Sequence, residues 1–373
     1  MTPAHQHRTG PMGVAVVGCG TISDQYLTNL TAFPDLRVLI CADLDPERAR
    51  AQAEAYGVPA WGGVAQALAH PDVELVVNLT VPAAHAEVGR AAVEAGKHVW
   101  NEKPLTADTA GARELLKAAG AAGVRVGGAP DTLLGAGLQS ALRLIRSGAI
   151  GAPLTALSLM QIPGPESWHP APEFLYRAGG GPLFDMGPYY LTALVAALGP
   201  VRRVSAVGSR SRDRRTIGSG PRAGTGFDVT VPTHVSALLE FAGGGSATAV
   251  FSFESPQLRL GFVEVTGTEA TLVLPDPNHF DGPSRIEDGG PAREVAATGT
   301  AAGRGIGVLD MARAIRSGEP HRATGELALH VLAVMEAIEA AAATGAPVEV
   351  AADAPSPQAL PEDWDPYAAT LAP

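Results

Sequence analysis

Residues 13–23 read GVAVVGCGTIS, a short apolar run that passes directly into a glycine-rich turn. A run of this length with β-branched residues predicts a buried parallel strand. Gly18 permits the tight turn, Gly20 lets backbone approach a pyrophosphate, and the helix that opens near Ser23 presents free N–H groups. Ser23 replaces the third glycine of the G-x-G-x-x-G pattern. A tight strand-to-helix turn without a ligand would leave the same pattern.

The next predicted strand, Leu36 to Ala42, ends at Asp43. An acid about 20 residues beyond the first glycine is expected to accept hydrogen bonds from the adenosine ribose. Leu44 follows it, with no Arg or Ser to receive a 2′-phosphate, so NAD is favoured over NADP. The alternative is an ordinary acid at a helix entry, although Asp45-Pro46 already supplies the cap and first-turn proline of the next helix.

Strands and helices then alternate along the first third of the chain. Helices are expected at 46–56, 63–69, 84–95 and 107–122, and strands near 60–61 and at 73–79, 97–101 and 124–129. This alternation predicts the α/β class with a doubly wound parallel sheet, whose ligands bind outside the carboxyl ends of the strands. Gly18, Asp43, Thr80 and Lys103 all fall at that edge.

Beyond Pro130 the pattern changes to strands with one buried face. Alternating apolar residues at 235–241 and 247–253, joined by three glycines, predict an antiparallel hairpin. Further helices are expected at 133–147, 306–317 and 325–343, and further strands at 153–162, 202–210, 259–266 and 270–275. The chain is therefore expected to form two domains, at 11–129 and 130–350, with an irregular tail at 351–373.

Residues 179–190 read GGGPLFDMGPYY. Three consecutive glycines indicate backbone that passes close to another group. Asp185 is predicted to begin an amphipathic helix that continues through Leu198, with Tyr189 one turn later on the same face. That face is expected to meet Lys103. The alternatives are that Asp185 only caps the helix and that Tyr189 packs in a core.

Three segments together resemble the glucose-fructose oxidoreductase and inositol dehydrogenase family (Gfo/Idh/MocA): residues 18–22, Glu102-Lys103-Pro104, and residues 179–190. The resemblance covers most of the chain. It implies a Rossmann domain followed by an α/β domain with an open, mainly antiparallel sheet that is commonly used for oligomerisation. It also implies nicotinamide-dependent oxidation or reduction of sugars, polyols and related compounds. Many members carry D-x-G-x-H, whereas Tyr189 stands at the histidine position here, as in glucose-fructose oxidoreductase itself and the dihydrodiol dehydrogenases.

The strand ends and the resemblance together define an expected cofactor site. Its residues are Gly18, Gly20, Thr21, Ile22, Asp43, Thr80, His85, Glu102 and Lys103. His85 matches a family position near the cofactor, and a helix-surface histidine is the alternative.

The expected catalytic residues are Lys103, Asp185 and Tyr189. Oxidation of a secondary alcohol removes a hydride from carbon and a proton from oxygen, with reacting atoms about 3–3.5 Å apart. Lys103 is expected to orient and polarise the substrate oxygen, and Tyr189 to donate or accept the proton. Asp185 would hydrogen-bond the substrate or hold the lysine.

A substrate loop is expected just before the three glycines. Trp168, His169 and Tyr176 would close over a sugar ring, although a lone histidine beside a proline is more often a loop contact. Residues 202–222 contain seven arginines and one acid. Such a run is usually a solvated loop, and the alternative is an anionic substrate held by Arg215.

Composition limits the class of protein. Hydrophobic residues make up 46% of the chain and charged residues 17%, which is typical of a soluble globular enzyme. The formal net charge of -11 disfavours a nucleic-acid partner. With no apolar run before the first strand and no stretch approaching the roughly 20 apolar residues of a membrane span, a cytoplasmic protein is expected. Cys19 and Cys41 suit reduced thiols, and neither C-x-x-C nor H-E-x-x-H occurs, so no metal site is expected.

The sequence therefore predicts an NAD(P)-dependent dehydrogenase or reductase acting on a CH–OH group of a sugar, polyol or keto-sugar, with NAD favoured. By resemblance, a homodimer or homotetramer is expected. An NAD-using glycosidase that retains its cofactor is an alternative within the enzymes. A dinucleotide-binding sensor without turnover is the alternative outside them, although such a module has no need of Lys103 and Asp185.

Overall fold

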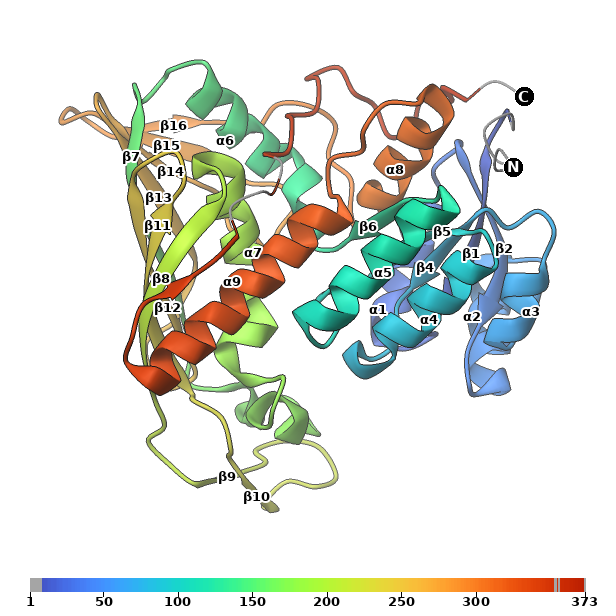
Figure 1. Cartoon of the computed structure of the whole chain (residues 1–373), viewed down its shortest axis with the longest axis horizontal. Coiled ribbons are helices and arrows are strands. Elements are labelled where there is room, and N and C mark those ends of the chain that lie inside the picture. Colours follow the sequence, from blue (N-terminus) through green and yellow to red (C-terminus); the bar gives the residue numbers. More distant parts are fainter. Residues whose placement is uncertain (1–8, 352–353, 355, 372–373) are drawn as a thin grey trace. The chain divides into compact units, whose positions relative to one another are not determined.

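The computed structural model describes residues 9–351, 354 and 356–371, and its first compact unit contains a six-stranded sheet (Figure 1). The strand order is β3-β2-β1-β4-β5-β6, and every neighbouring pair is parallel. The strands are β1 (Met12–Val17), β2 (Leu36–Ala42), β3 (Trp61–Gly62), β4 (Leu75–Asn78), β5 (His98–Asn101) and β6 (Val126–Gly128). The order reverses between β1 and β4, so the predicted doubly wound parallel sheet is confirmed.

Helices connect these strands in the order that the sequence predicts. They are α1 (Thr21–Leu30), α2 (Pro46–Tyr56), α3 (Val64–Ala69), α4 (Pro82–Glu94) and α5 (Thr109–Ala122). Asp45 caps α2 by accepting the Glu47 N–H, and Gly57 ends the helix with a left-handed φ of 66°. Local capping therefore explains why the bounds of α2 are readable from sequence.

The second unit contains a nine-stranded sheet in the order β16-β15-β14-β13-β7-β12-β11-β8-β17. All neighbours are antiparallel except β12 and β7. The strands are β7 (Pro153–Gln161), β8 (Val201–Ser209), β11 (His234–Phe241), β12 (Ser246–Ser252), β13 (Arg259–Gly267), β14 (Thr271–Val273), β15 (Ser284–Glu287), β16 (Arg293–Val295) and β17 (Val348–Glu349). The expected open, mainly antiparallel sheet is confirmed.

One face of this sheet carries the core of the second unit. In the β11–β12 hairpin, Ala237 pairs with Ala249 and Leu239 with Ala247, and all four are buried. Helices α7 (Gly181–Leu198) and α9 (Gly325–Thr344) cover that face, with α6 (Ala136–Arg146) beside them (Figure 1). The period-two pattern of the sequence thus identifies the buried face correctly.

Several short elements are not predicted by the sequence pattern. They are the paired strands β9 (Arg214–Thr216) and β10 (Gly226–Asp228), the short strands β15 to β17, and the 3₁₀ turns η1 (Asp131–Leu134), η2 (Pro165–Ser167) and η3 (Pro172–Tyr176). Elements of two to five residues carry too little periodicity to be recognised.

The start of α7 differs from the prediction. The helix begins at Gly181 with Gly180 as its N-cap, so Asp185 lies inside the helix. The interpretation of Asp185 as a helix cap is therefore wrong. Pro182 occupies the first turn, where proline is tolerated, which moves the start one turn earlier.

The chain passes between the two compact units four times. The first unit comprises residues 1–136, 298–329 and 357–373, and the second comprises residues 137–297 and 330–356. Helix α8 (Ile306–Ser317) therefore belongs with the parallel sheet, and α9 is shared between the units. The predicted domain boundaries at residues 129 and 350 remain a prediction.

Among the described residues of 351–371 there is no helix or strand. This tail packs on the first unit through Asp35, which is fully buried. Asp35 accepts hydrogen bonds from the backbone of Thr370 and Leu371 at 2.9 Å each and from Arg313 at 2.8 Å. The described residues near Thr370 and Leu371 are thus irregular in conformation but anchored on the first unit.

One described helix, α9, is long and apolar enough to cross a membrane by length and composition. The expectation that no stretch approaches such a span is therefore wrong. In this structure 56% of the apolar window is buried within the protein, as in the core helix of a globular protein.

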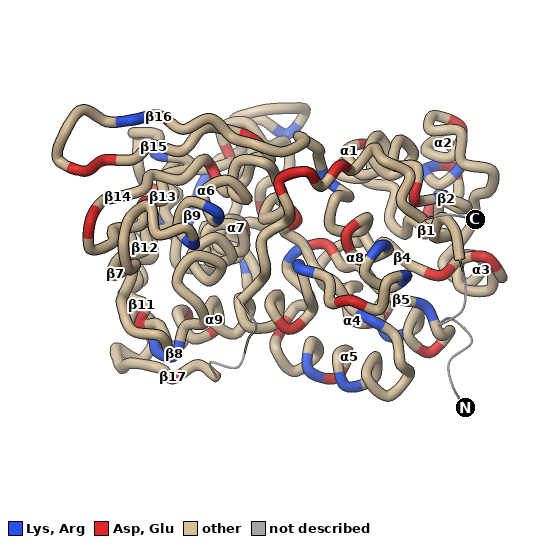
Figure 2. Tube along the Cα trace, turned by 90° about the horizontal axis from the view of Figure 1, so that it is seen from above, with Lys and Arg blue, Asp and Glu red and all other residues tan. Residues whose placement is uncertain are grey.

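Charged residues of both signs are interspersed along the trace of both units (Figure 2). Within the arginine-rich segment, Arg210 pairs with Asp213 at 2.7 Å and Arg203 with Glu240 at 2.6 Å. Most of these pairs are exposed, so each adds little to stability.

Candidate dinucleotide and active site

Gly18 lies in the turn between β1 and α1 and has a φ of 97°. A Cβ atom here would lie 2.6 Å from the carbonyl carbon of Leu79, in the turn after β4. Its N–H donates to the carbonyl of Ala42 at 2.8 Å. Only glycine satisfies both the left-handed φ and the close approach of the neighbouring turn.

Gly20 plays a different part in the same turn. It is exposed, and no atom lies within 4 Å of the position of a Cβ atom. It is the N-cap of α1 and supplies no side-chain cap for the first N–H groups of the helix. This open helix N-terminus fits a pyrophosphate.

Asp43 follows β2 and is tied to the glycine turn. One carboxylate oxygen accepts the Cys19 N–H at 2.7 Å, and the other accepts the Asp45 N–H at 2.9 Å. Asp45, not Asp43, is the N-cap of α2. A carboxylate oxygen has more than one lone pair, so Asp43 retains the capacity to accept ribose hydroxyls.

His85 is fully buried on α4, so the interpretation as a helix-surface histidine is wrong. Its Nδ1 lies 2.7 Å from the carbonyl oxygen of Pro104, and its Nε2 lies 3.0 Å from that of Thr80. Burial lowers the pKa of His85, against the opposing effect of the two carbonyls and Glu102. The ring thus joins the turns that follow β4 and β5.

Glu102 fixes the backbone of Lys103. One carboxylate oxygen accepts the Lys103 N–H at 2.7 Å, and the other accepts the Tyr26 hydroxyl at 2.9 Å. The Trp100 indole N–H donates to that hydroxyl at 3.3 Å. Lys103 is half-buried and is followed by a cis peptide to Pro104.

Two further charged residues near Glu102 are not predicted by the sequence. Asp131 is fully buried, and its Oδ2 accepts the N–H groups of Gly305 and Gly307 at 2.7 and 3.2 Å. Arg304 lies 3.9 Å from Glu102 and 4.0 Å from Asp131. Neither carries a local motif, and Arg304 is separated from Glu102 by most of the second unit's sequence, so no sequence signal relates them.

The predicted catalytic residues of the segment 179–190 lie in the second unit. Asp185 is half-buried and Tyr189 is buried one turn further along α7. A Cβ atom on Gly180 would lie 2.5 Å from the carbonyl oxygen of Phe174. The prediction of close backbone approach at the glycines is confirmed, and the neighbour is the chain's own η3 segment.

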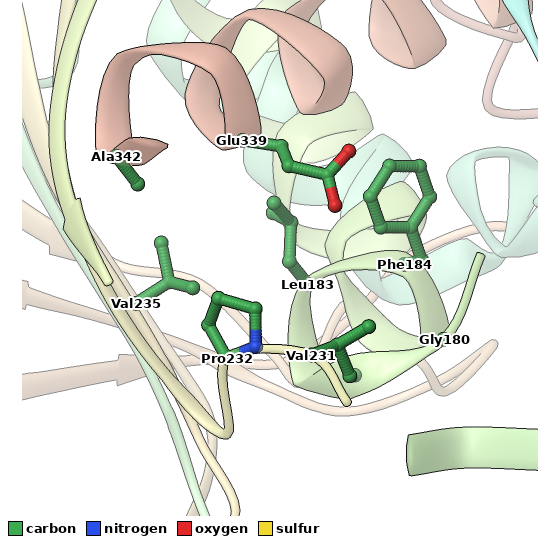
Figure 3. A pocket seen from close by; sticks show the side chains of 9 residues that line it. Gly180, Leu183, Phe184, Val231, Pro232, Val235, Glu339 and Ala342 are labelled. Atoms are coloured by element: carbon green, nitrogen blue, oxygen red, sulfur yellow. The ribbon is translucent and has the colours of Figure 1, made fainter. Parts of the chain in front are cut away.

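A small pocket borders the same glycines (Figure 3). Leu183 and Phe184 of α7 line it together with Val231, Val235 and the carboxylate of Glu339 on α9. Burial raises the pKa of Glu339, and the neighbouring Glu336 adds to this effect. The lining is otherwise apolar, and none of the predicted catalytic side chains is part of it.

The predicted substrate loop carries an exposed aromatic cluster. Trp168 is 64% exposed and Phe174 is 60% exposed. His169 lies between them, with ring centroids 5.5 and 5.4 Å away in edge-on contacts. Tyr176, by contrast, is fully buried and donates its hydroxyl to Glu166.

Arg215 lies in the interior of the second unit, so the solvated-loop interpretation is wrong at this position. Its guanidinium lies 2.5 Å from Glu166 and 2.8 Å from Glu254, and it stacks over the Tyr176 ring. Burial raises the pKa of Glu254, but hydrogen bonds from Ser211 and Thr233 and the charge of Arg215 outweigh it and lower the value to about 2. Glu166 and Glu254 are isolated acids in the sequence, which gives no signal of their pairing.

The structure thus gathers the predicted cofactor residues at the carboxyl edge of the first unit's sheet. Lys103 belongs to that edge. Asp185, Tyr189, Trp168, His169, Tyr176 and Arg215 belong to the second unit. Among the described residues, no group of three or more His, Cys, Asp or Glu side chains is arranged to hold a metal ion.

Known proteins share both parts of this arrangement. A model of the oxidoreductase family with an NAD-binding Rossmann fold matches residues 12–128, and a model of the GFO/IDH/MocA C-terminal domain matches residues 138–273. The dTDP-3,4-didehydro-2,6-dideoxy-alpha-D-glucose 3-reductase of Streptomyces antibioticus is 33% identical over 64% of this chain and 70% of its own. The D-xylose 1-dehydrogenase (NADP(+)) 2 of Haloferax volcanii is 28% identical over 83% of this chain and 90% of its own.

A solved structure agrees with this assignment. The aldose-aldose oxidoreductase of Caulobacter crescentus, solved in complex with glycerol, has a TM-score of 0.78 and 25% identity, covering 91% of this chain and 100% of that one. The two family models together span more than half of the 373 residues. The chain therefore belongs to the Gfo/Idh/MocA family of oxidoreductases, with an NAD-binding Rossmann domain followed by the family's C-terminal domain.

Proposed function

We propose that this protein is an NAD-dependent dehydrogenase or reductase that acts on a CH–OH group of a sugar, polyol or keto-sugar. The observation that carries the proposal is Lys103, whose backbone is held by Glu102 at the edge of the sheet where the glycine turn and Asp43 also lie. The relatives named above act on a nucleotide-linked sugar and on xylose, which supports the substrate class.

Bound nicotinamide would supply the hydride acceptor or donor. The open N-terminus of α1 at Gly20 and the carboxylate of Asp43 are the groups that would hold the dinucleotide, with Thr80 and His85 shaping the turns beside it. Lys103 would orient and polarise the substrate oxygen, and Tyr189 would exchange the proton at that oxygen. Asp185 would hydrogen-bond the substrate or hold the lysine.

NAD is proposed over NADP because Asp43 is fixed as a hydrogen-bond acceptor at the ribose position. Its oxygens are oriented by the N–H groups of Cys19 and Asp45, and an ionised carboxylate there repels a 2′-phosphate. The name of the Haloferax relative specifies NADP, so the preference is a property to be measured on this chain.

The substrate side is proposed to lie in the second unit. Trp168 and His169 offer aromatic faces for a sugar ring, and the buried Tyr176 donates its hydroxyl to Glu166 in the segment before them. Arg215 is proposed to act through this loop, since its guanidinium is engaged by Glu166 and Glu254. Measuring the KM for substrate in an Arg215→Ala variant tests this role.

The exposed face of the nine-stranded sheet is proposed to pair with a second copy. A row of side chains crosses five strands on the face opposite α7, consisting of Phe262, Leu159, Val250, Ser236 and Val207. Val207 is 70% exposed, and contiguous exposed apolar surface favours association. Light scattering on the wild type and on Val207→Glu tests for a homodimer or homotetramer.

Two free, buried cysteines support a reducing compartment such as the cytoplasm.

The experiment is a panel of sugars, inositols and their oxidised forms, with NAD and NADP in parallel, followed by absorbance of the reduced nicotinamide. Wild type is expected to turn over a panel member with NAD, at least about tenfold better than with NADP. Lys103→Met is expected to lower kcat by at least about a thousandfold while NAD binding changes little.

Lys117→Met is the matched control, because Lys117 is an exposed lysine on α5 and its replacement removes the same charge. Retained turnover in Lys103→Met would contradict the assignment. NAD binding without any turnover on the panel would instead favour a sensor or a glycosidase that retains its cofactor. Tyr189→Phe is expected to reduce kcat in a pH-dependent manner, and an unchanged rate across pH would exclude the tyrosine.

A further inference from the structure

A buried charge cluster lies behind the Lys103 turn, in addition to the groups used in the proposed reaction. Glu102 is 8% exposed, Arg304 is 9% exposed, and Asp131 and Tyr26 are fully buried. All belong to the first unit. Acids and bases this deeply buried are rare unless they compensate one another's charge.

Arg304 lies between the two acids of this cluster. Its NH1 is 3.9 Å from Oε1 of Glu102 and 4.0 Å from Oδ1 of Asp131. Burial raises the pKa of Asp131, the charge of Arg304 lowers it, and the charge of Glu102 adds a smaller rise. Arg304 thus places a positive charge beside two buried carboxylates that repel one another.

The backbone holds Arg304 in this place. Its carbonyl accepts from Asn29 at 2.9 Å, and its Nε donates to Gln25 at 3.2 Å, both on α1. Asp131 accepts the N–H of the next residue, Gly305, at 2.7 Å. Gly305 has a φ of 102°, so the turn that aims Arg304 depends on glycine.

Glu102 connects this cluster to the backbone of Lys103. Its two oxygens accept the Lys103 N–H at 2.7 Å and the Tyr26 hydroxyl at 2.9 Å. An ionised carboxylate accepts both bonds strongly, whereas a neutral acid accepts them weakly and must place a proton of its own. The position of the Lys103 backbone therefore depends on where the Glu102 carboxylate is held.

We propose that Arg304 is a positioning residue for Lys103, which it orients through the carboxylate of Glu102. The inference rests on the proposed function, because its main readout is turnover. It assigns a role in the active site to a segment that lies far along the chain, immediately before α8.

The test is a double-mutant cycle with the substrate found on the panel. Arg304→Met is expected to lower kcat by about tenfold or more with little change in the KM for NAD, and Arg304→Lys to restore most of that loss because it keeps the charge. In a Glu102→Gln background, where no carboxylate remains to be held, Arg304→Met is expected to lower kcat by less than about twofold further.

Arg322→Met is the matched control. Arg322 forms a similarly buried pair with Asp310 in the same unit but lies outside the Glu102 cluster. It is expected to lose stability without a selective fall in kcat. If Arg304→Met does not fold, Arg304→Gln takes its place in the cycle.

A second measurement is independent of turnover. Carboxyl carbon NMR of ¹³C-labelled aspartate, assigned with Asp131→Asn, is expected to show the pKa of Asp131 near 6 in the wild type and higher in Arg304→Met. An unchanged Asp131 titration would overturn the proposal. So would an Arg304→Met substitution that lowers kcat by the same factor in the Glu102→Gln background as in the wild type. If Lys103→Met is inactive and Arg304→Met is fully active, the inference fails while the proposed function stands.

Discussion

Asp131 is a carboxylic acid with no exposure to solvent, held at the start of α8. Burial raises its pKa from 3.8 to about 6, although Arg304 and the N–H groups of Gly305 and Gly307 act in the opposite direction. The folded state therefore binds a proton more tightly than the unfolded state. The resulting stability is fully present below about pH 4 and is lost as the pH rises through about 6.

Asp131→Asn is expected to remove this pH dependence, because the amide oxygen still accepts the Gly305 N–H but does not titrate. Each unit of pKa shift corresponds to about 1.4 kcal/mol, so the free energy of unfolding of the variant should gain about 3 kcal/mol relative to the wild type between about pH 3 and 7. Urea denaturation across this range measures it. Asp72→Asn, at an exposed position, is the control, and its free energy of unfolding should differ from that of the wild type by the same amount at every pH. A constant difference for Asp131→Asn as well would contradict the assignment.

At the scale of an element, the turn between β1 and α1 separates the requirements of the fold from those of a ligand. Gly18 has a left-handed φ and almost touches the backbone after β4, whereas Gly20 has an ordinary φ of -82° and open space at its Cβ position. In this motif, Gly18 is therefore required by the fold, whereas Gly20 leaves space for a ligand.

Gly18→Ala is expected to destabilise the protein by about 2–3 kcal/mol, because the added methyl group meets the Leu79 backbone in a strained conformation. Gly20→Ala is expected to change stability by less than about 0.5 kcal/mol and yet weaken NAD binding by about tenfold or more, because the methyl group occupies the space proposed for the pyrophosphate. Thermal unfolding and calorimetric titration with NAD measure the two effects. Unchanged NAD affinity in Gly20→Ala would place the pyrophosphate elsewhere.

At the scale of the whole molecule, the C-terminal tail completes the first unit. Asp35, just before β2, accepts from Thr370 and Leu371 and from Arg313 on α8. Arg313 also donates to the carbonyls of Asp365 and Ala368 and stacks on Trp364. Burial raises the pKa of Asp35, but these hydrogen bonds outweigh it and lower the value. This stability is present above about pH 4 and is lost as the pH falls further.

Asp35→Ala is expected to lower the free energy of unfolding by about 3–5 kcal/mol, because it leaves Arg313 partly buried without its carboxylate. Deletion of residues 357–373 should have a comparable effect, and the two changes together should be far from additive, because they remove the same contacts. Chemical denaturation of the four proteins measures this. Full additivity would show that the tail and Asp35 act separately.

The sequence alone determined the order of the elements in the first unit. Apolar runs, caps such as Asp45 and glycine stops such as Gly57 are local signals, and they place α2 at the bounds the structure has. The cofactor edge followed for the same reason, since the parallel topology brings the carboxyl ends of all its strands to one side. Period-two alternation likewise determined the β11–β12 hairpin and its buried face.

Only the tertiary structure decided which charged residues are partners. Arg215 lies in an arginine-rich run that looks solvated in sequence, yet strand β9 turns it inward onto Glu166 and Glu254. Arg304 and Asp131 join Glu102, and Asp35 meets Thr370, across separations that no local pattern spans. Burial and charge pairing depend on the packing of distant segments, whereas helix caps and strand periods depend on neighbours along the chain. The sequence therefore located the sheet edge proposed for the cofactor, and only the fold identified the charged residues that lie behind it.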